Sequence, residues 1–596
     1  MLYKSSRHGF TSARALLLLT FGAACSSACV SEVAPTPTPP PEPVSASRPP
    51  PPISGGTLLV TKDNSTIVAA DPDRDRVLIA DIASRSLSGE IQFDLGDEPG
   101  RVVEGAPGRA YVALRRAGEV VAIDLAQKNI VSQTAVCPAP RGMAHVNGQL
   151  HVACAGGELV TLDTATNTVV RSLKPGDDLR DIVVQGSDLL VTQFRSAQVL
   201  RIDANGTVTE VQTMIPGGPF SFGMEAAVAW RMVSLPTGGV GVVHQSASIN
   251  PVMDDQEGGY GEPGPCGGDD GIVKSFVSFG NGASGVPMKS GTSIRRSALP
   301  VDIAFSNDGK RMAVVSAGSN KVVEKDTAAY SATADSGDCE PDDDDDDFQH
   351  GQPIAVAFAD STRIVQTREP ARIIVGQGDI IELGGESMVD TGHEMFHKAA
   401  SARTGLACAS CHPEGREDGR VWQFASTGAR RTQSIAGGIL ATAPFHWNGD
   451  LNGFDALMTN VFTKRMSGPE LAPIERLAAA RWIDAIPQVA VSPVEDPVAV
   501  AHGKTLFEDA AVGCAGCHSG VRLTNNQSVD VGTFGVMQVP SLNGLASRAP
   551  YMHDGCAKTL EDRFTNTACG GGDLHGHTSQ LSAADVADLV AYLKTL

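Results

Sequence analysis

The sequence predicts a multidomain protein in which a large all-β region precedes an all-α region. Three observations support this prediction: a strand-and-turn phrase recurs at intervals of 39 to 43 residues, a short cysteine–histidine motif occurs twice in the last third, and helical periodicity begins after residue 385. The 596 residues are enough for about three or four domains. The 64 glycines and 5% aromatic residues are typical of a turn-rich β protein.

The recurring phrase lies within residues 57–384. Each copy has two or three apolar residues, an aspartate, a polar turn and a second strand: "RVLIADIASRSLSG" (76–89), "EVVAIDLAQKNIVS" (119–132), "ELVTLDTATNTVVR" (158–171) and "QVLRIDANGTVTEV" (198–211). The aspartates Asp81, Asp124, Asp163 and Asp203 are separated by 43, 39 and 40 residues. A four-stranded propeller blade takes about 40–45 residues, so the region fits about seven blades. We therefore predict a seven-bladed β-propeller that resembles the YVTN, WD40 and quinohaemoprotein dehydrogenase propellers, a likeness of fold rather than function.

Two insertions interrupt this pattern. Residues 250–271 are rich in glycine and acidic residues, and residues 335–351 contain the run Asp342–Asp347. Carboxylates are the oxygen ligands that Ca²⁺ prefers, but consecutive aspartates repel one another, and we favour a solvated acidic loop.

The N-terminus is typical of an export signal. Lys4, Arg7 and Arg14 precede the apolar stretch 15–24, which is too short to span a membrane. Residues 1–29 are therefore predicted to be a signal peptide, with Cys25 either lipid-modified or simply close to the cleavage site. The proline-rich residues 30–56 are predicted to be an extended linker. The expected location is the periplasm or cell envelope, either free or lipid-anchored to the outer membrane.

Twelve cysteines remain to be placed. Export implies an oxidising compartment, in which cysteines pair. Proximity favours the pairs Cys137–Cys154, Cys266–Cys339 and Cys556–Cys569, with Cys29 left over, although spacing alone does not fix the connectivity.

Two C-x-x-C-H motifs indicate covalent haem c. The cofactor-binding residues are Cys408, Cys411 and His412 in "GLACASCHPEG", and Cys514, Cys517 and His518 in "VGCAGCHSG". In each motif the cysteines attach the haem and the histidine binds one face of its iron. Four structural cysteines would leave the two histidines unexplained.

The two motifs belong to an internal duplication, 385–490 and 491–596. Residues 390–412 parallel 500–518, with Phe396 and Phe507 at matching places, and 432–450 parallel 539–555. Each half ends in a predicted amphipathic helix. The first helix begins near Pro473, and the second begins at Ser582 with Asp585 three residues later, a capping-box pattern.

These features resemble the bacterial di-haem cytochrome c peroxidase and MauG family. The resemblance rests on the paired motifs, "PSLN", "APYMHDG" with "TLED", and the C-terminal "LSAADVADLVAYLKTL". It implies two cytochrome-c-like lobes with one haem c each. One haem would take up electrons, and the other would perform peroxide or other oxidative chemistry. It also implies Ca²⁺ between the lobes, for which no ligands can be assigned.

The ligand on the second face of each iron is predicted less directly. For the first haem the candidates are Met466, on a loop just before the closing helix, and His446. For the second haem they are Met552, His553, His575 and His577. Aligning Leu471 with Leu581 places Met466 opposite Gly576, between His575 and His577, and we favour His575. The predicted iron ligands are thus His412, Met466, His518 and His575.

No catalytic acid or base can be assigned. Glu414, Glu417, Asp418, Gln423 and Gln433 follow the first motif, and each is expected to be a solvated loop residue. Trp422 and Trp447 are candidate electron relays or simply packed side chains.

The leading hypothesis is therefore an oxidoreductase that moves electrons between two haems to reduce hydrogen peroxide or oxidise a partner. The alternative is a non-catalytic electron-transfer protein with the propeller as a docking module. A propeller that acts as a dehydrogenase ranks last, because no cofactor cluster is found in it. The expected partner is an electron-donor or acceptor protein such as a small cytochrome. A net charge of −21 argues against nucleic acid, and membrane contact is expected only through the N-terminal lipid.

Overall fold

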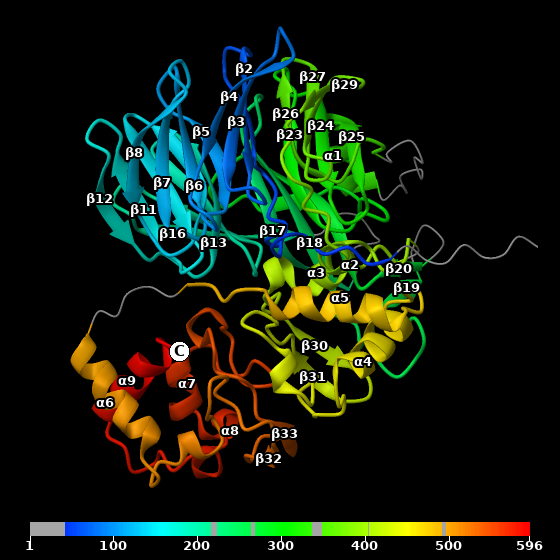
Figure 1. The fold of residues 1–596 in the computed structure, drawn as a ribbon. Helices are drawn as coiled ribbons and strands as arrows, with labels where there is room; N and C mark the ends of the chain where they lie inside the picture. The colour runs from blue at the N-terminus through cyan, green and yellow to red at the C-terminus, as the bar shows by residue number, and fades with distance from the viewer. Residues whose placement is uncertain (1–41, 216–222, 264–268, 337–347, 403, 491–495) are drawn as a thin grey trace, which may run out of the picture. The chain divides into compact units, whose positions relative to one another are not determined.

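The computed structural model describes residues 42–215, 223–263, 269–336, 348–402, 404–490 and 496–596. Antiparallel strands make up a large propeller-like region up to residue 384, and short helices dominate the residues after 390 (Figure 1). The predicted order, a β region followed by a helical region, is confirmed. The predicted signal peptide, Cys25, Cys29, the Cys266–Cys339 pair and the run Asp342–Asp347 lie outside the described residues.

The sheets of the propeller-like region follow one another in chain order. Their strands are β1–β4 (Leu58–Val60, Thr66–Asp71, Arg76–Asp81, Ser86–Gln92), β5–β8 (Pro99–Glu104, Arg109–Leu114, Glu119–Asp124, Asn129–Ala135), β9–β12 (Pro140–Val146, Gln149–Cys154, Leu159–Asp163, Thr168–Leu173), β13–β16 (Leu179–Gln185, Asp188–Gln193, Gln198–Ile202, Val208–Ile215), β17, β18, β21 and β22 (Met224–Ser234, Val240–Ser248, Val273–Gly280, Met288–Ser290), β23–β25 (Pro300–Phe305, Arg311–Ser316, Lys321–Asp326) and β26–β29 (Pro353–Ala359, Thr362–Thr367, Arg372–Val375, Asp379–Glu382). Strand β16 also pairs in parallel with β22 and thereby joins two of these sheets.

The first strand of each sheet contacts the first strand of the next. This holds for β1, β5, β9, β13, β17, β23 and β26 in that order, and β26 in turn contacts β1. The series of sheets therefore closes on itself, as in a propeller.

The recurring aspartates have a local structural role. Asp81, Asp124 and Asp163 end the third strand of their sheets, and Asp203 follows β15. Each accepts a backbone N–H two to four residues ahead, for example Ser84 N to Asp81 Oδ1 at 2.7 Å and Thr207 N to Asp203 Oδ1 at 2.8 Å. Aspartate caps the turn that leads to the outer strand, which explains the period in the sequence.

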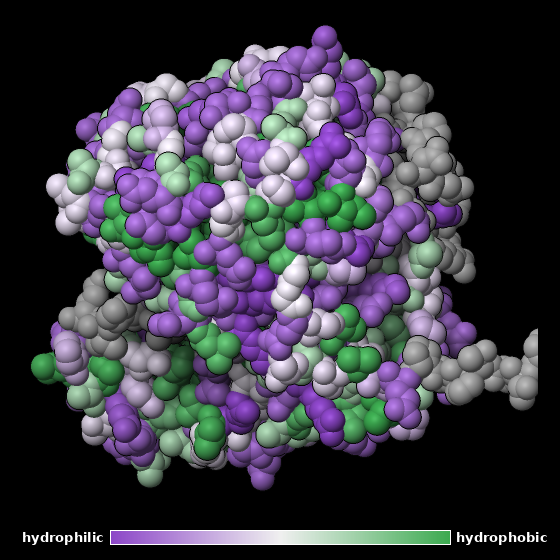
Figure 2. All heavy atoms as spheres, turned by 45° about the horizontal axis from the view of Figure 1, so that its top comes forward, coloured by the Kyte–Doolittle hydropathy of each residue, from purple (hydrophilic) through white to green (hydrophobic). Residues whose placement is uncertain are grey.

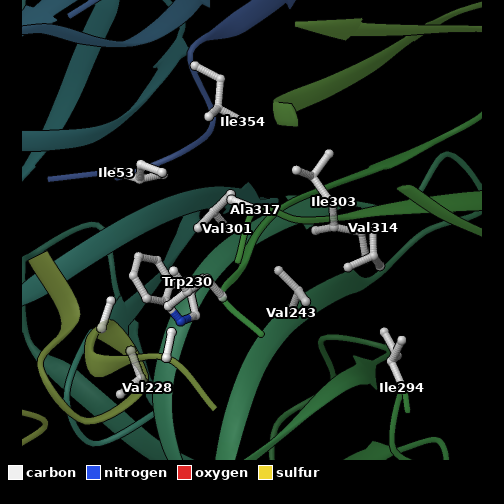
Figure 3. Packing of buried hydrophobic residues seen from close by; sticks show 14 of the residues in the cluster. Ile53, Val228, Trp230, Val243, Ile294, Val301, Ile303, Val314, Ala317 and Ile354 are labelled. Atoms are coloured by element: carbon white, nitrogen blue, oxygen red, sulfur yellow. The ribbon is translucent and has the colours of Figure 1, made fainter. Parts of the chain in front are cut away.

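The proline-rich segment Pro43–Gly56 is extended and lies against other parts of the chain. Trp482 Nε1 donates to Pro50 O at 3.0 Å, and Ile53 N donates to His397 Nε2 at 3.1 Å. Ile53 is buried in one hydrophobic cluster with Trp230, Val301 and Ile354, and Figure 3 shows it among side chains from several strands. The segment therefore connects the helical residues to the propeller-like region through buried contacts.

The helical residues form two similar segments, called here the first segment (385–490) and the second segment (496–596). In the first, α2 (Thr391–His397) packs against α5 (Pro473–Asp484), and in the second, α6 (Pro497–Glu508) packs against α9 (Ala583–Leu593). A Cβ on Gly392 or Gly503 would overlap the partner helix, so glycine permits the close approach in both pairs. Ser582 accepts the N–H of Asp585 at 3.1 Å, which confirms the predicted capping box of α9.

The segments also contain shorter elements. They are α3 (Cys408–Cys411), η3 (Pro413–Gly415), β30 (Val421–Phe424), β31 (Gly428–Arg431), η4 (Leu440–Thr442), α4 (Phe454–Leu457), the π-helix η5 (Met458–Arg465), η6 (Cys514–Gly516), β32 (Ser528–Asp530), β33 (Val536–Gln538), η7 (Leu545–Ser547), α7 (Leu560–Thr565), α8 (Thr567–Gly570) and η8 (Gly572–His575). Each segment also includes a two-stranded sheet. The sequence predicted an all-α region, and the structure is mainly helical with these two small sheets added. In the propeller-like region, β19 (Gly261–Pro263), β20 (Asp269–Gly271) and α1 (Thr327–Ser336) lie between the main strands.

Disulfides Cys137–Cys154 and Cys556–Cys569 are both present, as predicted. Cys408, Cys411, Cys514 and Cys517 are free thiols.

Hydrophilic residues cover most of the face drawn in Figure 2, with smaller groups of hydrophobic residues between them. Within the described part of the chain, every helix is too short or too polar to cross a membrane.

Candidate haem centres

The first motif lines a cavity of about 370 Å³. Cys408 and Cys411 are on the single turn of α3, and His412 follows directly. The Nδ1 atom of His412 lies 3.0 Å from Arg416 O. An imidazole whose Nδ1–H is bonded to a backbone carbonyl has a free Nε2, the arrangement of a metal-binding histidine.

The second motif lines a separate cavity of about 220 Å³. Here His518 Nδ1 lies 3.2 Å from Leu523 O, the same kind of backbone contact that His412 makes. Burial lowers the pKa of both His412 and His518. Burial thereby favours the neutral form, which a metal ligand must have.

Both sets of residues fit haem c. Each offers two free thiols one turn apart for covalent attachment and one neutral imidazole beside an apolar cavity. The second cavity also contains Arg563, whose Nη1 is buried without a hydrogen-bond partner among the described residues. A buried, unpaired guanidinium nitrogen fits an anionic group such as a haem propionate.

His575 faces His518 across the second cavity. The two ring centroids are 6.3 Å apart. An iron bound by both Nε2 atoms at about 2.0 Å requires a centroid separation of roughly 6 Å. His575 Nδ1 lies 3.2 Å from Gly570 O, the same backbone contact that the motif histidines make. Burial, with Arg563 and His518 nearby, lowers the pKa of His575 to about 3.

The other candidate ligands for the second face of this haem lie elsewhere around the cavity or outside it. Met552 and His553 line the cavity as well, and the His553 ring packs 6.3 Å from that of Trp447. His577 is exposed and does not line the cavity. Of the two histidines that flank Gly576, His575, which the sequence favoured, lines the cavity near His518, and His577 does not.

Met466 and His446 both line the first cavity. Met466 is buried at the end of the π-helix η5, at 6% exposure. The side chain of His446 is 30% exposed, and its Nδ1 lies 3.1 Å from Asp450 Oδ1. Both residues stay candidates for the second face of the first haem, and burial of a soft thioether favours Met466.

Trp447 lines both cavities, and its Nε1 donates to Arg431 O at 2.7 Å. Trp422 lines only the first cavity and donates its Nε1 to Asp418 Oδ2 at 3.2 Å. Trp447 is thus the tryptophan placed between the two sites.

The carboxylates after the first motif are not solvated, which corrects the expectation from sequence. Glu417 and Asp418 are each 1% exposed, and Glu414 is paired with Arg141, Arg180 and Arg115. Burial alone would raise the pKa of Glu414, but these arginines outweigh it and hold the pKa well below its ordinary value. Burial raises the pKa of Asp418.

The arginines that pair with these carboxylates come from the propeller-like region, and the sequence prediction missed them. Arg141 in β9 and Arg180 in β13 pair with Glu414. Arg101 in β5 pairs instead with Asp181, and the three arginines are 40 and 39 residues apart. That spacing equals the period of the recurring aspartates. An arginine repeated at the blade period, within otherwise apolar strands, was the available signal.

No group of three or more His, Cys, Asp or Glu side chains able to hold a metal ion occurs in the described ranges. The expected Ca²⁺ therefore gains no assigned ligands there.

The C-terminal residues contain a cytochrome c domain, and a propeller-like region precedes it. Residues 500–596 match the Cytochrome c family model, so the chain carries a cytochrome c domain at its C-terminus, which implies covalently bound haem c. The match includes Cys514, Cys517 and His518.

Two curated proteins are similar to this chain. One is hydrazine synthase subunit gamma of Kuenenia stuttgartiensis, 27% identical over 276 residues, which are 35% of this chain and 77% of that protein. The other is cytochrome-c peroxidase IdrP2 of Pseudomonas sp. (strain SCT), 25% identical over 318 residues, which are 37% of this chain and 86% of that protein. Both similarities agree with a redox function that uses haem.

Solved structures show a weaker likeness. Hydrazine synthase of Kuenenia stuttgartiensis aligns with a TM-score of 0.43 and 17% identity, covering 56% of this chain and 96% of that one. Streptogramin B lyase aligns with a TM-score of 0.37 and 12% identity, covering 55% and 94%. The propeller-like arrangement follows from the strand order and contacts of the chain itself.

Proposed function

We propose that the chain is an exported di-haem c-type oxidoreductase that moves electrons between two haems to reduce peroxide or oxidise a partner. The observation that carries this proposal is the pair of unequal cavities on either side of Trp447, each with a C-x-x-C-H motif. The similarity to a cytochrome-c peroxidase supports it.

Each proposed haem supplies an iron that accepts and donates one electron and, where one face is free, binds a peroxide. The residues of the chain would divide the work. His412 and His518 would bind the two irons, and Met466 and His575 would be the further ligands of the first and second iron. Trp447 fills the space between the cavities, where an aromatic ring shortens the route for an electron.

The two proposed second-face ligands, Met466 and His575, differ in how rigid the backbone around them is. Met466 is fixed at the end of a helix. His575 ends a short 3₁₀ turn between Gly571 and Gly576, both of which have positive φ. Glycines at such positions let the backbone move at little cost. We propose that the second haem is the site at which a ligand can be exchanged, and that the first haem takes up electrons.

Further parts of the proposal rest on sequence. The closed series of sheets supports a propeller of seven blades, and the repeated helix pairs support two cytochrome-c-like lobes. Export to the periplasm, a lipid at Cys25, a small cytochrome as electron partner and Ca²⁺ between the lobes complete the proposal.

The alternative is a non-catalytic electron-transfer protein with the propeller as a docking module. One observation favours it: His575 is already in place opposite His518, so both faces of the second iron would be filled.

Spectra and turnover distinguish the two functions. Purified full-length protein is measured by absorption and electron paramagnetic resonance, fully oxidised and half-reduced, and then given hydrogen peroxide with a reduced donor. Peroxide consumption together with a high-spin haem supports the oxidoreductase. Two low-spin haems at every redox level, without peroxide consumption, favour the alternative.

A further inference from the structure

Side chains of the propeller-like region hold the first haem motif itself. Gln245, on β18 and 1% exposed, donates its Nε2 to Ser410 O at 3.0 Å. Ser410 lies between Cys408 and Cys411. The Gln245 side chain is oriented in turn by Trp230, whose Nε1 donates to Gln245 Oε1. The turn that carries both thiols is therefore bonded to a fixed donor from a strand 165 residues away in sequence.

Two residues after the motif histidine, Glu414 is held by the arginines of successive sheets. Arg141 Nη2 lies 2.7 Å from its Oε2, and Arg180 Nη1 lies 2.5 Å from its Oε1. Glu414 has φ of 54°, a left-handed conformation that is unfavourable for a residue other than glycine. The buried ion pairs offset this cost and fix the path of the loop as it leaves His412.

The contact of greatest consequence is between Arg416 and Asp178. The Arg416 guanidinium donates to Asp178 Oδ1 at 3.1 Å and to Ser547 O of the second segment at 3.0 Å. The backbone carbonyl of the same arginine accepts from His412 Nδ1 at 3.0 Å. Asp178 precedes β13, is buried, and is also bound by Arg141 at 2.8 Å. The carbonyl that orients the first motif histidine is thus anchored, through one side chain, to the propeller-like region.

We infer that Asp178 is a positioning residue for the first haem. Through Arg416 it fixes the carbonyl that accepts a hydrogen bond from His412 Nδ1–H, and it thereby sets the midpoint potential of that haem. The inference rests on the proposed function insofar as the first motif carries a haem. A firm Nδ1–H···O=C bond makes the imidazole a stronger donor to iron, which stabilises the oxidised state. Loosening the bond weakens that donation and raises the potential.

The propeller-like region is, on this inference, the outer half of the first haem site rather than a separate module. The C-terminal end of the proline-rich segment Pro43–Gly56 agrees with this inference, because Arg180, which holds Glu414, also donates to Ser54 O at 2.7 Å.

The test compares two matched variants of the full-length holoprotein, Asp178→Asn and Asp181→Asn. Both carboxylates are buried and bound by arginines. Among the described residues, the Asp181 carboxylate bonds within the propeller-like region, to Arg101, Arg231 and Met232 N. Haem content per chain is measured first, then the midpoint potentials by spectroelectrochemical titration. The transition absent from a Cys408→Ala/Cys411→Ala variant identifies the first haem.

Asp178→Asn is expected to shift the redox equilibrium of the first haem about tenfold toward the reduced state, which is about +59 mV for a one-electron couple. The second haem keeps its potential, and Asp181→Asn leaves both unchanged. Arg416→Lys keeps the charge but loses the fork that reaches Asp178 and Ser547 together, so it is expected to shift the first haem in the same direction.

Equal first-haem potentials in Asp178→Asn and Asp181→Asn, with both haems loaded, would overturn the inference. A shift in Asp178→Asn with none in Arg416→Lys would also overturn it, because charge alone would then explain the effect. A wild-type chain without the first haem would instead contradict the proposed function, so the two failures are distinguishable.

Discussion

His575 and Met466, the two proposed second-face ligands, line the cavities of the two motifs in very different surroundings. Met466 is buried at the end of a helix, whereas His575 ends a short turn between glycines. The His575 ring has its Nδ1 at a backbone oxygen, as the motif histidines do. A histidine so arranged is prepared to bind a metal through Nε2.

Replacing His575 by alanine is expected to convert one haem to the high-spin form. The physical reason is that His575 is the ring that lies 6.3 Å from His518, and alanine has no group that can bind iron. His577→Ala is the control, since His577 is exposed outside the cavity. Magnetic circular dichroism of the oxidised protein measures the spin states. A low-spin spectrum in His575→Ala, or a high-spin haem in His577→Ala, would refute the assignment.

Met466→Leu is expected to abolish the methionine–iron charge-transfer band, with little change in folding because the two side chains have similar volume. His446→Ala should keep the band, because His446 is occupied by Asp450 and partly exposed. Loss of the band in His446→Ala but not in Met466→Leu, or absence of the band from the wild-type protein, would contradict the assignment of Met466.

Two further histidines matter for stability rather than for haem. His393 and His397 on α2 are buried, and they bond to the proline-rich segment Pro43–Gly56 at Pro51 and Ile53. Burial lowers the pKa of His397 to about 3 and that of His393 well below 6.5. Below pH 6.5 the unfolded chain therefore binds protons that the folded chain does not.

The unfolding free energy is consequently expected to fall as the pH drops from 6.5 toward 3, by about 1.4 kcal/mol per pH unit for each buried histidine. Urea unfolding at several pH values measures the slope. His397→Gln keeps an acceptor for Ile53 N but does not titrate, so its slope should be shallower. Identical slopes in the two proteins would refute the role of His397.

At the scale of elements, the two helical segments repeat in detail. The Phe445–Leu451 bridge of the first matches the Tyr551–Ala557 bridge of the second. His446 and Met552, which follow the matching aromatic residues, have φ of 67° and 69°. Trp447 and His553 are therefore equivalent residues, and their ring centroids are 6.3 Å apart.

The motif histidines were predictable because a haem motif is local. The pairing of Trp447 with His553 was not, because it depends on how the segments meet.

Gly503→Ala is expected to destabilise the second segment by about 1–3 kcal/mol, as overpacking in a well-packed contact does. The added methyl group would overlap Asp588 O of α9 and cannot be accommodated by a side-chain rotation. Gly453→Ala is the control, because a Cβ there meets nothing within 4 Å. Thermal unfolding followed by circular dichroism compares them, and equal midpoints would contradict the close packing of α6 and α9.

At the scale of the whole molecule, the sheets were predictable and their connection to the haem sites was not. Turn-capping aspartates such as Asp81 repeat in the sequence because each acts within a few residues. The partners Arg180 and Glu414 are 234 residues apart, and no local pattern links them. For this reason the carboxylates after the first motif looked like solvated loop residues, although they are buried ion-pair partners.

The central claim is that two haems with different ligands act together, one holding its ligands and one exchanging a ligand. Electron paramagnetic resonance of the full-length protein, recorded fully oxidised and again after reduction of one haem, tests it most directly. The account predicts two distinct low-spin signals that give way, on half-reduction, to a high-spin signal abolished by peroxide. A single haem signal, or two haems that stay low-spin after half-reduction, would contradict it.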